Sequence, residues 1–105
     1  MFYRWEDITP VEVRPGVRRR TIVGTNLSVS YVELDPDVAT PFHTHDNEQV
    51  VTVMEGRMEF RTDKESSVLG PGETVVFAPN VPHQGKALGG RALALEALSP
   101  ARHES

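Results

Sequence analysis

The stretch His43-Thr44-His45-Asp46-Asn47-Glu48-Gln49 sets both the expected fold and the expected site of this chain. Successive side chains of a β-strand point to opposite faces, so His43 and His45 are expected to share one face. Gln49 has the same parity and joins them if the short Asp46-Asn47 segment preserves the register. Glu48 is the stronger metal ligand chemically, but its parity is wrong, so it remains the alternative to Gln49.

A third histidine, His83, follows a loop that contains two prolines. Three imidazoles and one amide oxygen form a set that divalent transition metals accept, so we predict a metal site of His43, His45, Gln49 and His83. Zn, Mn, Fe and Ni all suit such ligands. Because the four ligands are uncharged, the ion would keep its double positive charge, which favours substrate polarisation and the attraction of an anion.

Composition narrows the class of protein. The chain has 105 residues, near the commonest size of a single domain. It has no cysteine, so neither a disulfide framework nor a thiolate zinc site is available. The net charge of -4 argues against a nucleic-acid partner. No apolar run is long enough to cross a bilayer, and residues 1–7 lack the layout of a signal peptide, so a cytoplasmic location is expected.

Glycine and proline separate short segments rich in β-branched residues, which predicts an all-β fold, either a sandwich or a small barrel. The expected strands are 27–34, 48–55, 57–62, 74–77 and 91–98. Gly56 is expected to supply the positive φ of a hairpin turn. Alanine and leucine would also allow a helix over 87–97, but the pair Gly89-Gly90 and the all-β context favour a strand there.

The N-terminal segment contains the one basic cluster, Arg18-Arg19-Arg20. In a strand these side chains alternate sides, and we interpret the cluster as a solvated edge strand protected by charge. Residues 1–26 contain strand-like segments without an evident partner in the chain, so we place them at the interface of a homodimer. Within a single domain of residues 1–105, residues 27–98 form the barrel, and 99–105, including an ordinary His103, form a polar tail.

These residues resemble the two motifs of the cupin superfamily. In the first, a His-x-His pair is followed by an acid or amide four positions on and by a glycine seven further on, as in His43 to Gly56; the second resembles residues 72–83. Asp37 and Asn80 stand where the family usually has glycine. Both residue types tolerate left-handed backbone, so the turns are expected to survive. The resemblance implies a single-domain cupin, a small β-barrel or jelly-roll sandwich.

Within the cupins, the chain is similar to the small group that contains the pectin-degradation enzyme opening 4,5-unsaturated uronates. The last strand of that family carries an acid and an aromatic residue facing the metal pocket and then an arginine, at positions matched by Glu96, Leu98 and Arg102. The resemblance implies that Glu96 moves a proton and that Arg102 grips a carboxylate. The structural alternatives are that Glu96 pairs with an arginine and that Arg102 only closes the chain. Leu98 lacks the aromatic ring, which opens the cavity to a different substrate.

The expected function is a metal-dependent enzyme acting on a small oxygenated anion, by resemblance the ring opening or tautomerisation of unsaturated uronates. An uncharged four-ligand site also suits Fe(II) and dioxygen, so an Fe(II)-dependent dioxygenase is the alternative enzyme. A non-catalytic cupin that binds a metabolite or a sugar is the alternative outside the enzymes.

Overall fold

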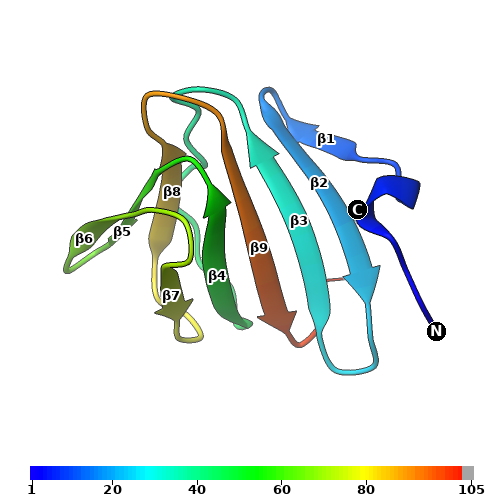
Figure 1. Cartoon of the computed structure of the whole chain (residues 1–105). Coiled ribbons are helices and arrows are strands. Elements are labelled where there is room, and N and C mark those ends of the chain that lie inside the picture. Colours follow the sequence, from blue (N-terminus) through cyan, green and yellow to red (C-terminus); the bar gives the residue numbers. More distant parts are fainter. Residues whose placement is uncertain (103–105) are drawn as a thin grey trace.

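The structure, a computed structural model, describes residues 1–102, and His103 lies outside the described residues. Two antiparallel sheets form a sandwich, which confirms the expected all-β cupin fold (Figure 1). The six-stranded sheet has the order β1 (Val11–Arg14), β2 (Val17–Val23), β3 (Ser28–Leu34), β9 (Ala92–Ser99), β4 (Glu48–Glu55) and β7 (Thr74–Phe77). The three-stranded sheet has the order β6 (Ser66–Leu69), β5 (Met58–Thr62) and β8 (His83–Ala87).

Residues 92–97 form most of β9, so the strand expected in this region is confirmed and the alternative of a helix over 87–97 is wrong. Figure 1 shows β9 lying between β3 and β4 at the centre of the large sheet. The short helical turn η1 (Trp5–Asp7) precedes β1. Within residues 1–102, no helix is long and apolar enough to cross a membrane.

The inner face of the large sheet divides into an apolar end and a polar end. In β3, every second residue is buried, beginning with Ser28 and Ser30 and ending with Val32 and Leu34. The apolar half packs against the small sheet in one cluster, which contains Val17, Val32, Leu34, Val51, Val53, Met58, Phe60, Phe77, Ala87, Ala92 and Ala94. The candidate site lies in a cavity between the sheets that is lined by residues of the apolar cluster and by polar residues.

The N-terminal strands find their partners within the chain, contrary to the expectation that they have none. β2 pairs with β3 from Val17 opposite Leu34 to Val23 opposite Ser28, and β1 pairs with β2. β2 is therefore an internal strand, and our interpretation of Arg18-Arg19-Arg20 as a solvated edge was wrong. The alternation of the three arginines is confirmed, because Arg18 pairs with Glu33 on the outer face while Arg19 lines the interior.

Both substituted turn positions have the backbone conformation expected of them. Asp37 has a φ of 62° and Asn80 a φ of 67°, and these are the positive-φ residues other than glycine in the described chain, 1–102. Gly56 has a φ of 79°, as its turn requires. Asp37 also accepts a hydrogen bond from the Gly89 N–H at 3.0 Å. The loss of two family glycines therefore leaves the turns intact.

Candidate metal centre

The three histidines are brought together by backbone pairing between a loop and β8. His43 and His83 exchange two backbone hydrogen bonds, of 3.1 and 3.0 Å, and the Asn80 N–H donates to the His45 carbonyl at 2.8 Å. His43 makes only this isolated bridge, and β4 begins at Glu48. The expectation that His43 and His45 lie in a regular strand was therefore wrong, although the two rings do lie on the same side.

Each histidine is held in one tautomer by a backbone carbonyl. The Nδ1 atoms of His43, His45 and His83 lie 2.8, 3.0 and 2.8 Å from the carbonyl oxygens of Pro41, Asn47 and Val81. A carbonyl oxygen only accepts, so each Nδ1 carries the proton and donates it. The Nε2 atom of each neutral ring then has a free lone pair, which is the form that binds a metal.

One ring nitrogen from each histidine lies within 4.8 Å of the others, so the three residues are positioned to hold a metal ion. Gln49 Oε1 lies 3.1 Å from Nε2 of His45 and 3.1 Å from Nε2 of His83. With the protons on Nδ1, these contacts join lone-pair atoms that have no hydrogen between them. A cation bound by these atoms would relieve that repulsion. The donor set fits a divalent transition ion.

The two candidates for the fourth position differ in burial. Gln49 is 5% exposed and faces the interior, opposite Phe77 on β7 and Leu98 on β9. Glu48 is exposed at the start of β4. The structure therefore brings the Gln49 amide, and not the Glu48 carboxylate, against the histidines.

His83 is the most deeply buried of the three histidines. Its ring stacks on Phe77, with centroids 4.3 Å apart and planes 11° from parallel. Burial lowers the pKa of the His83 imidazole, the hydrogen bond to the Val81 carbonyl opposes this shift, and the neighbouring His43 and His45 add to it. The neutral, metal-binding form of His83 is therefore favoured near neutral pH.

All six residues predicted for the site line one cavity of about 220 Å³: His43, His45, Gln49, His83, Glu96 and Arg102. Glu96 is half-buried on β9, where it lies opposite Ser30 of β3 and Val51 of β4. Arg102 follows the buried Ala101, and its backbone N–H donates to Ser28 Oγ at 2.8 Å. Residues 99–102, expected as part of a polar tail, therefore pack onto the fold.

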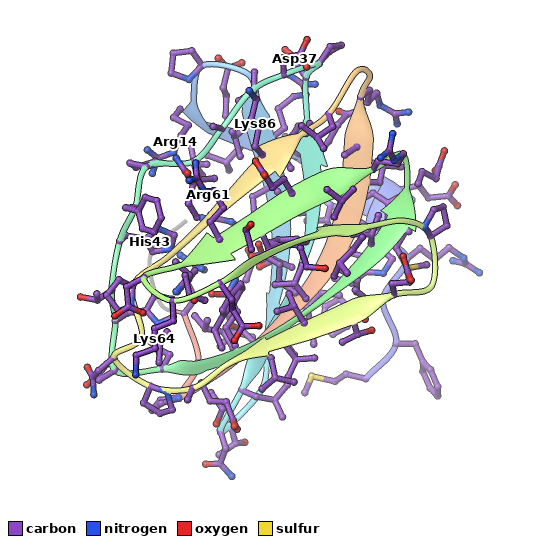
Figure 2. The ribbon with its side chains drawn as sticks, turned by 90° about the vertical axis from the view of Figure 1, so that its left-hand side faces the viewer. Arg14, Asp37, His43, Arg61, Lys64 and Lys86 are labelled. Atoms are coloured by element: carbon purple, nitrogen blue, oxygen red, sulfur yellow. The ribbon has the colours of Figure 1, made fainter. Side chains whose placement is uncertain are left out.

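Two further arginines line the same cavity and were not predicted from the sequence. Arg19 shares the inner face of β2 with the buried Val17, so the alternation of side chains along the strand could have predicted that Arg19 faces the interior. Arg14 lies at the end of β1, where the pairing with β2 shifts register, and alternation alone would place it on the other face. Figure 2 shows the labelled Arg14 and His43 side chains on the same side of the molecule.

A cupin sandwich with three histidines gathered around one cavity defines the class of this protein. The cupin domain matches residues 30–98, and the chain belongs to the cupin family. Among solved structures it is similar to KdgF from Halomonas sp., with 25% identity, a TM-score of 0.92, and coverage of 98% of this chain and 96% of that one. This likeness supports the resemblance to small single-domain cupins that the motifs indicated.

Two other solved structures share the fold at lower identity. An RmlC-like cupin from Shewanella frigidimarina has 23% identity and a TM-score of 0.91, with 97% and 92% of the two chains covered. The polyketide cyclase RemF from Streptomyces resistomycificus has 23% identity and a TM-score of 0.84, with 99% of this chain and 83% of that chain covered. No curated protein sequence matches this chain significantly.

Proposed function

We propose that this cupin is a metal-dependent enzyme that acts on a small oxygenated anion, with His43, His45, His83 and Gln49 as the metal ligands. The observation that carries the proposal is the joint lining of one small cavity by these four residues, an acid and arginines. A cavity of about 220 Å³ lies below the range of roughly 300–1,000 Å³ typical of drug-sized ligands. A substrate of monosaccharide size suits it.

The roles of the chain's own groups follow from their chemistry. A divalent ion bound by the four neutral ligands would act as a Lewis acid. Glu96, half-buried on β9, lines the cavity, and in this proposal it takes up or returns a proton. The Arg102 guanidinium offers two parallel N–H donors to a substrate carboxylate. The hydrogen bond from the Arg102 N–H to Ser28 fixes the Arg102 backbone, from which the side chain extends.

The likeness to KdgF and the matching of Glu96 and Arg102 to the uronate-opening cupins support unsaturated uronates as the first substrates to test. The test is a ring-opening assay on a 4,5-unsaturated uronate with the metal-loaded chain, the chelated chain and a Glu96→Gln variant. Turnover that is lost on chelation, restored by added metal and lowered about 10²–10³-fold in Glu96→Gln is expected. A metal-loaded protein without turnover would refute this activity.

The uncharged ligand set favours one second candidate, an Fe(II)-dependent dioxygenase. Oxygen uptake by the Fe(II)-loaded chain with candidate substrates separates the two reactions. Metal and ligand binding without either reaction would instead indicate a non-catalytic binding cupin.

We also propose that the chain forms a homodimer through the outer face of its large sheet. Aligned side chains on that face form an apolar row across five strands: Ile22, Val29, Ala97, Val50 and Val76. Val76 is 60% exposed. An apolar row of this kind on an open sheet face favours burial against a second copy.

A further inference from the structure

The open end of the cavity is marked by an arginine with no partner in the described chain. Of the residues that line the cavity, Arg14, Pro41 and His43 are the exposed ones, so they form its mouth. Figure 2 shows Arg14 and His43 along the same side of the molecule. Arg14 therefore lies at the same open end of the cavity as His43.

A β-bulge turns Arg14 toward the interior. Val11 lies opposite Arg19 and Glu12 opposite Arg18, but Arg14 lies opposite Val17, so the pairing shifts by one residue between Glu12 and Arg14. Val13 packs on the core cluster, and Arg14, its neighbour, lines the cavity. Two successive side chains on one side of a strand are a mark of a bulge, and bulges are frequent beside active sites because they redirect a side chain.

The charge of Arg14 is not engaged within residues 1–102. Arg18 forms ion pairs with Glu33 and Asp35, and Arg91 also pairs with Glu33. The Arg14 side chain makes no hydrogen bond or ion pair in this part of the chain. An arginine directed to the mouth of a cavity and left without an acid is available to an anion from solution.

We propose that Arg14 is a specificity-determining residue that binds a second acidic group of the substrate at the mouth of the cavity. The inference rests on the proposed function, in which Arg102 holds a first carboxylate near the metal ligands. Among the small oxygenated anions of the proposed function, it favours those with two acidic groups, because Arg14 adds a second arginine contact to that of Arg102. A uronate, with one carboxylate, leaves Arg14 without an anion.

The test compares galactarate, a six-carbon sugar diacid, with galacturonate, the matching monoacid, by calorimetric titration of the Zn²⁺-loaded full chain at low ionic strength. Wild type is expected to bind galactarate about tenfold more tightly than galacturonate. Arg14→Ala should lose that preference while keeping the affinity for galacturonate. Arg14→Lys, which keeps the charge but not the paired donors, should retain part of it.

Arg57→Ala is the matched control, since Arg57 is an exposed arginine that does not line the cavity. It should keep the full preference, and added salt should weaken the preference of wild type. Equal affinities in wild type, no binding of either acid, or a preference that survives Arg14→Ala would each overturn the inference.

The outcomes separate this inference from the proposed function. A chain that opens unsaturated uronates but binds the two acids equally keeps the proposed function and refutes the role of Arg14. A chain that prefers galactarate through Arg14 but has no turnover on uronates keeps the role of Arg14 and refutes that activity.

Discussion

In the proposed metal centre, Gln49 controls how much positive charge the ion presents to a ligand. It is buried against His45 and His83, and as an amide it adds no negative charge to the three neutral imidazoles. A carboxylate in its place would leave the same number of ligand atoms but neutralise half of the ion's charge.

Gln49→Glu should therefore keep the metal and weaken the binding of an anion by about tenfold. Metal content and the affinity of the Zn²⁺-loaded chain for galacturonate are the measurements. Glu48→Gln is the control, since Glu48 is exposed at the adjacent position, and it should change neither quantity substantially. Unchanged anion affinity in Gln49→Glu, or metal loss in Glu48→Gln, would contradict the assignment of Gln49.

The sequence indicated which residues lie at the site, but it did not indicate correctly how the backbone brings them together. Parity selected Gln49 over Glu48, and the structure brings Gln49 to the histidines. Parity was the wrong argument for His43 and His45, because a loop hydrogen-bonded to β8 places them. Arg14 was not predictable, because the bulge that turns it inward depends on the pairing of β1 with β2 and leaves no local pattern.

At the scale of the elements, Gly56 sets how tightly the β4–β5 hairpin packs on the segment before β9. Its φ is 79°, and a Cβ there would clash with the Arg91 carbonyl oxygen. Gly89 has a similar φ of 76°, but a Cβ there would meet no atom within 4 Å. Comparing an alanine substitution at each glycine therefore distinguishes the cost of backbone strain from the cost of a steric clash.

Gly89→Ala should lower the free energy of unfolding by about 1–2 kcal/mol through left-handed strain alone. Gly56→Ala should lower it by about 2–4 kcal/mol, since the backbone must also move. Urea denaturation of both variants makes the comparison. Equal losses of unfolding free energy in the two variants would show that the clash of the new Cβ with Arg91 costs no stability.

Glu33 links three segments on the outer face of the large sheet. It lies on β3, pairs with Arg18 on β2, and pairs with Arg91 just before β9. The hydrogen bonds from Arg91 and Arg18 hold the pKa of Glu33 below its ordinary value. The folded state therefore favours the carboxylate, so this stabilisation is present above a pH of about 4.3 and is lost as the pH falls through the lowered pKa.

Glu33→Gln should lower the free energy of unfolding at pH 7 by about 0.5–1 kcal/mol, a small effect because the pair is partly exposed. The difference from wild type should shrink in acid. Urea denaturation at neutral and acidic pH measures both values. Glu65→Gln, at an exposed turn position, should change little at either pH, and a Glu33→Gln deficit that persists in acid would contradict the linkage.

Elements were predictable where their hydrophobic pattern is local. The expected strands 48–55 and 74–77 coincide with β4 and β7, because β-branched residues fill segments bounded by turn residues. β6 was not expected, because Ser66-Ser67-Val68-Leu69 is too short and polar to stand out. The place of β2 inside the sheet is set by its pairing with β3, which no local pattern shows.

At the scale of the whole molecule, the charge of the cavity is opposite to that of the chain. The net charge is -4, yet Arg14, Arg19 and Arg102 all line the cavity with one acid, Glu96. An overall negative charge disfavours nucleic acid, whereas the excess of arginine over acid in the cavity supports the small anion proposed as substrate. The net charge of the chain therefore bears on nucleic acid as a partner, but it does not indicate the sign of the charge in the cavity.

The proposed dimer is tested by light scattering at micromolar concentration. Wild type should show the mass of two chains, and Val76→Lys should shift the mass toward one chain, because it places a charge in the apolar row on the outer face of the large sheet. Val76 is exposed, so the variant should fold normally. A wild-type monomer would contradict the proposal.

Elemental analysis measures whether His43, His45 and His83 hold a metal ion. Wild type, the double variant His43→Ala/His45→Ala and the control His103→Ala are loaded with Zn²⁺ and dialysed together. About one ion per chain is expected in wild type and in His103→Ala, and less than about a tenth of that in the double variant. Full metal occupancy in a folded double variant would contradict this expectation.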